Sequence, residues 1–421
     1  MPKRGAGGSN STSRPPLLSS CYNPHMYNST LIHYEEIALK GKNRHFFEKK
    51  LVENIRQVLD GSVTVRYEFG RLVIPQVLSK EELRNVAKLF GVSWLAPAIC
   101  VELNIENIEE TAVNLVQDLL KTPEFKKEDL SFAIRATRAD KQFPLNSKEI
   151  EERLGEKVRT KYSLRVNLDQ PDLTVCVEVT EQNAFIYANK YYGPGGLPAG
   201  SSGKVIVLFS GGLDSAVAAY LMGQRGCRVH LLHFHALSDN KKVKETKVFK
   251  MAEKLSSFYP GLDLTVIPYI NYSMAMLDLP QSLSGQELIV FRRYMAKCAA
   301  RLAESAGADA VITGDSLGQV ASQTMSNLSA VNQIVSTDIE NYVPMLRPLV
   351  GLNKRRITEI GIEIGMFELA NENYKDCCSI AAKHPCTRAN LRKIEEIERL
   401  VNMGELVKKS FAESKCWRIG T

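Results

Sequence analysis

The 421-residue chain lacks any apolar run long enough to cross a bilayer. Its N-terminus is basic but has no apolar core of the kind found in signal peptides, so we expect a cytoplasmic protein without a membrane segment. The nine cysteines are scattered through a long chain and do not form a disulfide scaffold, so most should be reduced. No internal repeat is present.

Composition restricts the class of protein only loosely. Hydrophobic residues make up 44% and charged residues 24%, which is ordinary for a soluble globular protein of two or three domains. The formal net charge of +7 permits a polyanionic partner without requiring one. The oligomeric state is not fixed by the sequence, and a homodimer is one option.

Two stretches rich in glycine, proline and serine divide the chain. Residues 1–26 have little to bury, so we predict a disordered tail; because Met26 precedes the first structured pattern, an upstream start codon is the favoured explanation. A second such stretch, residues 191–203, reads as a linker. Between them, residues 27–190 predict an α+β half made of two small units, with a hairpin at 63–75 and a helix capped by Ser79 and Glu82.

Beyond the linker the pattern alternates between strands and helices. Strands are expected near 204–209, 228–234, 264–269 and 309–313, and helices near 214–225, 242–257 and 286–305. Such alternation is typical of an α/β domain with a doubly wound parallel sheet. We therefore predict one such domain over residues 204–421.

The segment SGGLDS, Ser210 to Ser215, lies where the first of these strands meets its helix. In an open α/β sheet ligands bind at this position, and glycines followed by a helix N-terminus favour a phosphate. Asp214 could orient a metal ion bound to that phosphate. A tight turn that simply needs glycine is the plainer alternative. The motif resembles the PP-loop of ATP pyrophosphatases, which adenylate a carbonyl oxygen so that a nucleophile can replace it.

Other polar residues follow the neighbouring elements. His230, His233 and His235 invite a metal interpretation, but His230 points to the opposite face of its strand, which disfavours it. Arg292 and Arg293 are either surface residues or a pair within reach of a polyphosphate. The segment after the strand at 309–313 is unusually rich in hydrogen-bonding side chains, among them Asp315, Gln319 and Gln323.

Three of the nine cysteines, Cys377, Cys378 and Cys386, lie within ten residues. Their spacing does not match a zinc knuckle, since no fourth cysteine is nearby. Buried, inert thiols are one interpretation, and a nucleophilic or redox pair is the other. The nearby Lys375, Lys383 and Arg388 would favour a thiolate.

Taken in order, the motifs after Met26 resemble the tRNA 4-thiouridine synthetase (ThiI) family. The matching segments are HYEEIALKGKNRHFFE, FAIRATRADKQFPLNSKEI, GPGGLPAGSSGK, SGGLDS, TGDSLGQVASQT and DCCSI…HPCTR. The resemblance implies a ferredoxin-like domain over 27–80, a THUMP RNA-binding domain over 81–190 and a PP-loop ATP pyrophosphatase domain over 204–421. It also implies ATP and Mg²⁺ as cofactors and tRNA as the substrate, with 4-thiouridine as the product.

The resemblance also assigns residues. Asp214 corresponds to the essential PP-loop aspartate and Cys378 to the active-site cysteine. The remaining predicted nucleotide contacts are Leu208, Phe209, Ser210, Gly211, Gly212, Ser215, His233, Phe234, Arg292, Gly314 and Gln323. The residues expected to meet the RNA backbone are Lys40, Lys42, Arg44, Arg135, Arg138 and Lys141, with a solvated charged face as the alternative.

The sulfur source is where the chain departs from the family pattern, because it ends at Thr421 with no room for a rhodanese domain. We expect a carrier in trans (a cysteine desulfurase or a rhodanese-type protein) or free sulfide, with Cys386 as a candidate catalytic partner of Cys378. An iron–sulfur cluster held with Cys298 is a further alternative. Sulfur supply for the thiazole of thiamine is a second role known in the family.

Two rival functions remain at this point. A PP-loop enzyme for a small molecule explains SGGLDS but not the RNA-type first half. A non-catalytic RNA-binding protein explains the first half, but the intact Ser210, Gly211, Gly212, Asp214 and Ser215 argue against it.

Overall fold

The computed structural model describes residues 23–61, 63–68, 70–126, 129–333, 343–374, 377, 380 and 386–420. These residues form two compact units. The N-terminal unit comprises the chain up to His33 together with Thr64–Arg84 and Trp94–Tyr192, and the C-terminal unit comprises Tyr34–Val63, Asn85–Ser93 and the chain from Gly193 onward. The domain boundaries predicted from the sequence remain predictions.

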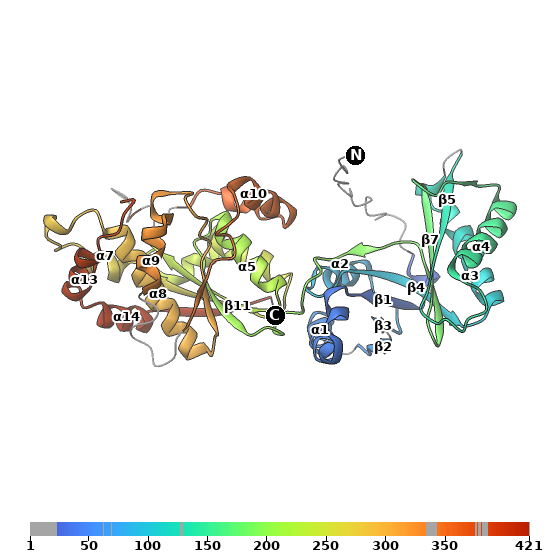
Figure 1. Ribbon diagram of the computed structural model, residues 1–421, viewed down its shortest axis with the longest axis horizontal. Helices are drawn as coiled ribbons and strands as arrows, with labels where there is room; N and C mark the ends of the chain where they lie inside the picture. The colour runs from blue at the N-terminus through green and yellow to red at the C-terminus, as the bar shows by residue number, and fades with distance from the viewer. Residues whose placement is uncertain are drawn as a thin grey trace, which may run out of the picture. The chain divides into compact units, whose positions relative to one another are not determined.

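The N-terminal unit is built on one nine-stranded sheet with the order β2-β3-β1-β4-β8-β7-β5-β6, in which β9 also pairs with β4 (Figure 1). Its strands are β1 (Ser29–His33), β2 (Arg66–Glu68), β3 (Arg71–Ile74), β4 (Trp94–Glu102), β5 (Ser131–Arg138), β6 (Arg165–Val166), β7 (Leu173–Val179), β8 (Asn183–Tyr187) and β9 (Tyr191–Tyr192). The helices are η1 (Pro24–Met26), α2 (Lys80–Lys88, which continues into the other unit), α3 (Ile105–Leu120), η3 (Pro123–Phe125) and α4 (Ser147–Tyr162). Side chains of α3 and α4 share one core with β5, β7 and β8.

A β-hairpin and a helix cap that were predicted from the sequence both form in this unit. The predicted hairpin forms between β2 and β3, which pair antiparallel. The predicted cap of α2 forms as a reciprocal pair: the Ser79 backbone N–H donates to Glu82 at 2.6 Å, and the Glu82 N–H donates to the Ser79 hydroxyl at 3.2 Å.

The C-terminal unit contains the predicted doubly wound sheet, in the order β14-β13-β10-β11-β12-β15. Every pairing is parallel except that of the edge strand β15, which runs antiparallel to β12 and was not foreseen. The strands are β10 (Lys204–Leu208), β11 (Arg228–His235), β12 (Leu262–Pro268), β13 (Ala310–Ile312), β14 (Met345–Leu346) and β15 (Lys415–Ile419).

Helices cover both faces of this sheet (Figure 1). They are α5 (Leu213–Gln224), η4 (Asn240–Glu245), α6 (Lys247–Ser256), α7 (Ile270–Ala275), η5 (Gln281–Leu283), α8 (Glu287–Ala306), α9 (Met325–Gln333), α10 (Lys354–Glu363), α11 (Phe367–Asn371), α13 (Leu391–Leu400) and α14 (Met403–Ala412). The segments η2 (Glu36–Asn43), α1 (Arg44–Val58) and η6 (Ala321–Gln323) are also assigned to this unit. Val205 and Val207 face the core of α5, α6 and α10, whereas Ile206 faces the core of α8, α13 and α14. The alternation explains why β10 is a continuous apolar run: both of its faces are buried.

One predicted helix is wrong in detail. The helix expected over 242–257 is divided into η4 and α6, because Thr246 takes an extended conformation between them (φ −98°, ψ 163°). No helix in the described part of the chain is long and apolar enough to cross a membrane.

The stretch predicted as a linker is packed against the C-terminal unit by backbone hydrogen bonds. The Leu197 N–H donates to the Gln224 carbonyl at 2.9 Å, and the Gly200 N–H donates to the Gly226 carbonyl at 2.8 Å. A Cβ at Gly196 would lie 2.2 Å from the Gln224 oxygen, so glycine is required for this approach. From Gly193 onward the predicted linker is therefore an ordered part of the C-terminal unit.

Candidate functional site

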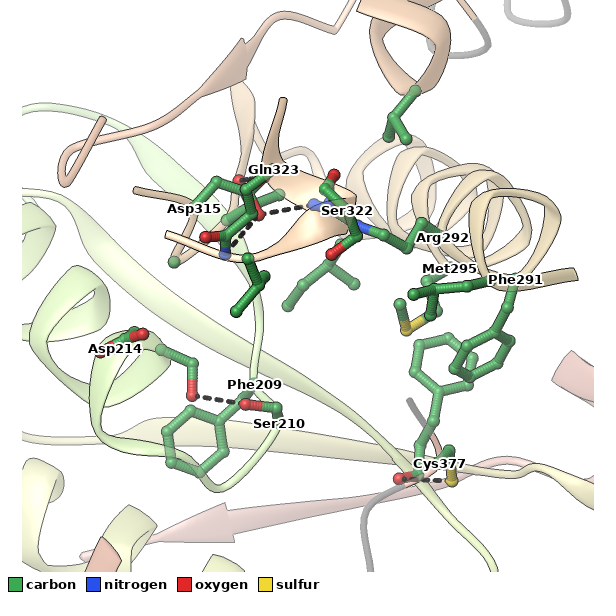
Figure 2. A pocket seen from close by; sticks show the side chains of 18 of the residues that line it. Phe209, Ser210, Asp214, Phe291, Arg292, Met295, Asp315, Ser322, Gln323 and Cys377 are labelled. Atoms are coloured by element: carbon green, nitrogen blue, oxygen red, sulfur yellow. Dashed lines mark hydrogen bonds and ion pairs between the residues drawn. The ribbon is translucent and has the colours of Figure 1, made fainter. Parts of the chain in front are cut away.

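A cavity of about 480 Å³ lies at the carboxyl ends of β10 and its neighbours. Strand β10 pairs with β11 on one side and β13 on the other, so the order of the strands reverses there. Ligands of open α/β sheets bind at such a point. Figure 2 shows the cavity with Ser210 and Asp214 on one side, Arg292, Asp315 and Gln323 on another, and Phe291, Met295 and Cys377 on an apolar third side.

The SGGLDS loop makes its tight turn through Gly211. This residue has a φ of +78°, and a Cβ there would lie 2.8 Å from the Val248 side chain, so only glycine fits. The Ser210 hydroxyl lies 3.2 Å from the Ser215 hydroxyl and accepts from the Gly212 N–H at 3.2 Å. Gly212 gives α5 no side-chain cap, which leaves the amides of the first turn available to an anion.

Asp214 in that first turn is held by two residues from distant parts of the chain. Its carboxylate accepts from Lys354 at 2.6 Å and from the Gln319 side chain at 2.8 Å. The sequence contained no signal for Lys354, which begins α10 and reaches Asp214 only because α10 packs beside α5. The loop therefore carries an ammonium group next to the predicted phosphate position.

Asp315, three residues after the end of β13, forms ion pairs with two arginines. Its carboxylate accepts from Arg292 at 2.5 Å and from Arg347 at 3.2 Å, and also from Thr313 and Gln323. Burial of this carboxyl opposes ionisation, but the two guanidinium groups and the Thr313 hydroxyl outweigh it and hold its pKa below the usual value. The cluster has one positive charge in excess, and Arg292 lies at the cavity wall.

The predicted arginine pair is divided by the structure. Arg292 lines the cavity and also donates to the Ser322 carbonyl at 2.7 Å. Arg293 is buried in another direction, where it forms an ion pair with Glu398 at 2.6 Å. Successive residues of a helix point about 100° apart, so only one of the two can face the cavity.

Most of the predicted nucleotide contacts line the cavity. These are Leu208, Phe209, Ser210, Asp214, Ser215, Phe234, Arg292, Gly314 and Gln323. The predicted residues that do not line it are Gly211, Gly212 and His233. Gly314 packs closely on the loop: a Cβ there would lie 2.8 Å from the Asp214 carbonyl carbon and the Ser215 nitrogen.

The three histidines of β11 each have a separate partner. His230 contacts Thr265 at 2.8 Å, and His235 contacts Asn240 at 2.7 Å. His233 lies behind the cavity, 2.7 Å from the Phe209 carbonyl and 2.8 Å from the Tyr374 hydroxyl. Within the described ranges no three His, Cys, Asp or Glu side chains gather as a metal site would require.

The cysteines are only partly described. Cys377 is buried at the cavity wall, where its thiol donates to the Phe234 carbonyl at 3.3 Å. Cys386 is half-buried; burial raises the pKa of its thiol, contrary to the expected effect of nearby basic residues. Cys298 is buried in the core beside Tyr294, and burial raises the pKa of its thiol well above the usual value, so it is a structural thiol. Cys378, Lys375 and Lys383 lie outside the described residues.

The predicted RNA-binding residues fall on both units. Lys40, Lys42 and Arg44 belong to the C-terminal unit; Lys40 pairs with Glu36, Lys42 is exposed, and Arg44 donates to the Ala38 carbonyl. In the N-terminal unit Arg135 and Lys141 are exposed.

Arg138 donates to two backbone carbonyls, whereas Arg44 and Arg135 each donate to one, that of Ala38 and that of Leu168 respectively. Its guanidinium donates to the carbonyls of Phe143 at 2.9 Å and Leu145 at 3.2 Å, which braces the loop before α4. A stabilising role for Arg138 is therefore visible in the fold itself.

Family comparisons cover nearly the whole chain. The family described as "Thiamine biosynthesis protein (ThiI)" matches residues 200–403, a THUMP domain matches 102–189, and a ThiI ferredoxin-like domain matches 29–96. A "Probable tRNA sulfurtransferase" of Brevibacillus brevis is 35% identical over 403 residues, covering 94% of this chain and 97% of the relative. One from Caldanaerobacter subterraneus is 37% identical over 384 residues, covering 90% and 96%.

Solved structures agree with these matches. A crystal structure of a 4-thiouridine synthetase–RNA complex with bound ATP is similar with a TM-score of 0.79 and 30% identity, covering 93% of this chain and 100% of the other. The PH1313 protein of Pyrococcus horikoshii is similar with a TM-score of 0.61 and 25% identity, covering 80% and 99%. The chain belongs to the ThiI family of tRNA sulfurtransferases.

Proposed function

We propose that the protein is an ATP-dependent tRNA sulfurtransferase that adenylates O4 of a uridine in tRNA and replaces this oxygen with sulfur, giving 4-thiouridine. The observation that carries the proposal is that the SGGLDS loop and the Asp315–Arg292 ion pair line the same cavity. The chain is also similar over 93% of its length to a 4-thiouridine synthetase with bound ATP. The rival interpretation as a small-molecule enzyme leaves the THUMP match unexplained.

The cavity has a polar side that suits the phosphates of ATP and an apolar side that suits its base. The loop amides and the hydroxyls of Ser210 and Ser215 suit phosphate oxygens, and Arg292 adds a positive charge at the wall. The apolar side, which includes Phe234, suits a base.

The reaction then has two steps. Uridine O4 attacks the α-phosphorus of ATP, the O4–P bond forms, and pyrophosphate leaves into the positive field of Arg292 and Lys354. A sulfur nucleophile next attacks C4, the C4–O4 bond breaks, and AMP departs with the oxygen. The protein thus converts a poor leaving group into a good one.

Magnesium fits this site through Asp214. The acidic side chains among the described lining residues are Asp214 and Asp315. Asp315 is buried and bound by two arginines, whereas Asp214 is partly exposed and pairs with a single cation, Lys354. Asp214 is therefore the carboxylate that would face a Mg²⁺ ion carried by the phosphates. Bound Mg²⁺ would neutralise phosphate charge and favour the departure of pyrophosphate.

For sulfur delivery we propose Cys378 as the essential cysteine and a separate persulfide-bearing protein as the donor, with sulfide as the alternative. The outer sulfur of the persulfide attacks C4 and AMP leaves; the Cys378 thiolate then attacks the inner sulfur, so 4-thiouridine is released and a disulfide forms between Cys378 and the donor. A thiol reductant reduces this disulfide before the next turnover. Cys386 remains the candidate partner of Cys378. Cys378→Ala should abolish 4-thiouridine formation while pyrophosphate release and tRNA binding persist, with the exposed Cys416→Ala as the matched control. Iron analysis of protein purified without oxygen decides whether a cluster is bound.

The tRNA contact is proposed to use Lys40, Lys42, Arg44, Arg135, Arg138 and Lys141 through charge rather than sequence. Replacing exposed Lys42 and Arg135 should weaken tRNA binding and reduce its dependence on salt. We place the reaction in the cytoplasm, and a homodimer and a role in thiazole sulfur supply remain predictions.

The test of the function is mass analysis of tRNA nucleosides after incubation with ATP, Mg²⁺ and sulfide. We expect 4-thiouridine from the wild-type protein and none from Asp214→Asn or from a reaction without ATP. Pyrophosphate release that needs no tRNA, with no thiolated nucleoside, would instead favour a small-molecule substrate.

A further inference from the structure

The carboxyl end of β11 contacts the chain on the N-terminal side of Cys378 at two points. The His233 Nε2 atom lies 2.8 Å from the Tyr374 hydroxyl, and the Cys377 thiol donates to the carbonyl of the next residue of the strand, Phe234, at 3.3 Å. Cys377 is the direct chain neighbour of Cys378.

The direction of the first contact follows from the other nitrogen of the ring. The His233 Nδ1 atom lies 2.7 Å from the Phe209 carbonyl, which can only accept, so Nδ1 carries a hydrogen. The ring is 1% exposed, and burial lowers its pKa to about 4, so it is neutral at pH 7. Nε2 must therefore accept from the Tyr374 hydroxyl.

A continuous set of hydrogen bonds results: the Tyr374 hydroxyl donates to His233, and His233 donates to Phe209. Phe209 lines the cavity and directly precedes Ser210 of the SGGLDS loop. The base of the nucleotide loop is thus tied to Tyr374 through one buried imidazole.

The two contacts lie on different sides of the sheet. Tyr374 packs against the core shared by α5 and α6, whereas Cys377 belongs to the core shared by α8 and α13. Cys377 and Phe234 also line the cavity (Figure 2). Tyr374 and Cys377 are therefore held on opposite faces of the sheet, both at the carboxyl end of β11.

We propose that Tyr374 and Cys377 are positioning residues for the sulfur step: their contacts with the end of β11 hold these two residues, which precede Cys378 in the chain, at the edge of the nucleotide cavity. The inference rests on the two-step function proposed above. The hydrogen bond from His233 to Phe209 involves neither the Tyr374 hydroxyl nor the Cys377 thiol, so the loop keeps this support when either contact is lost. Loss of either contact should therefore separate pyrophosphate release from thiolation.

Cys377 acts in this scheme through its hydrogen bond and not as a sulfur carrier. Its side chain is 3% exposed, and its hydrogen is donated to the Phe234 carbonyl. A serine at this position retains a donor to the same carbonyl, whereas alanine does not.

The experiment uses the full chain with tRNA, ATP and Mg²⁺, a bacterial cysteine desulfurase with cysteine as the persulfide donor, and a dithiol reductant that reopens the disulfide after each turnover. Pyrophosphate and 4-thiouridine are measured in the same reaction. For Tyr374→Phe we expect pyrophosphate release within about twofold of wild type and 4-thiouridine formation reduced roughly tenfold, the effect of one lost hydrogen bond. Cys377→Ala should behave similarly, and Cys377→Ser should stay near wild type.

Tyr272→Phe is the matched control, since it removes a tyrosine hydroxyl that donates to the Glu287 carbonyl at 2.9 Å in the same unit. It should leave the ratio of 4-thiouridine to pyrophosphate unchanged.

Three results would overturn the inference: a wild-type ratio for Tyr374→Phe, a proportional loss of both products, or a complete loss of thiolation in Cys377→Ser. Absence of both products from the wild-type protein would instead reject the proposed function itself.

Discussion

Lys354 and Asp214 form an ion pair of 2.6 Å across the N-terminus of α5. The ammonium is half-exposed, whereas the carboxylate is mostly covered, so the lysine reaches in from solvent to the loop. The pair joins the residue expected to assist phosphate binding to a cation that no sequence motif indicated.

The first prediction concerns Lys354. Lys354→Met should reduce the rate of pyrophosphate release by roughly a hundredfold, because it removes a positive charge where negative charge develops on the leaving group. ATP binding should weaken much less than the rate. Lys250→Met, which removes a comparable exposed ion pair with Glu372, is the control and should retain activity. Steady-state kinetics of both variants measure the effect; equal losses would contradict it.

Asp315 provides a prediction about stability. Asp315→Ala leaves Arg292 and Arg347 without their shared carboxylate in a buried site, so the free energy of unfolding should fall by about 3–5 kcal/mol. ATP affinity should fall as well, because Arg292 loses its anchor. Asp263→Ala breaks the more exposed pair with Arg418 and should cost only about 1 kcal/mol or less.

Urea unfolding of the two variants and ATP titration by calorimetry test this prediction. Similar losses of stability in Asp315→Ala and Asp263→Ala would show that the Asp315 cluster contributes no more than a surface ion pair.

Gly314 tests the packing of the site. The φ of Gly314 lies outside the left-handed region, so its backbone conformation does not itself require glycine. Gly314→Ala is unfavourable because the new Cβ would lie 2.8 Å from the backbone of Asp214 and Ser215. We expect ATP affinity to fall at least about tenfold, since the loop must shift. Gly404→Ala, where no atom lies within 4 Å of the new Cβ, is the control. Unchanged ATP affinity in Gly314→Ala would mean that the loop adapts freely.

The buried histidines predict a pH dependence of stability. Burial lowers the pKa of His230 and of His233 to about 4, from an ordinary value of 6.5. Below pH 6.5 the unfolded chain therefore binds more protons than the folded one. Their stabilising effect is complete above pH 6.5 and declines as the pH falls towards 4, by up to about 1.4 kcal/mol per pH unit for each histidine.

Thermal unfolding at pH 7 and pH 5 measures this decline, and His230→Gln, distant from the cavity lining, should reduce it. An identical difference between the two pH values in wild type and variant would exclude His230 as a contributor.

Much of the architecture could be predicted from local sequence. The apolar run before Ser210 becomes β10 because both its faces are buried, and Gly211 marks the turn because its φ of +78° excludes other residues. The Ser79–Glu82 cap and the β2–β3 hairpin depend only on neighbours in the chain. The division of η4 from α6 was missed, although Thr246, the N-cap of α6, is of a residue type that is favoured at that position.

The sequence by itself determined the glycine turn after β10, the order of the first four strands of the C-terminal sheet, and the family, because these depend on short motifs and on periodicity. Only the tertiary structure decided which charged side chains meet. Arg292 and Arg293 are adjacent in sequence, yet one faces the cavity and the other Glu398. Lys354, Arg347 and Tyr374 joined the site through contacts between segments far apart in the chain, where local patterns carry no information.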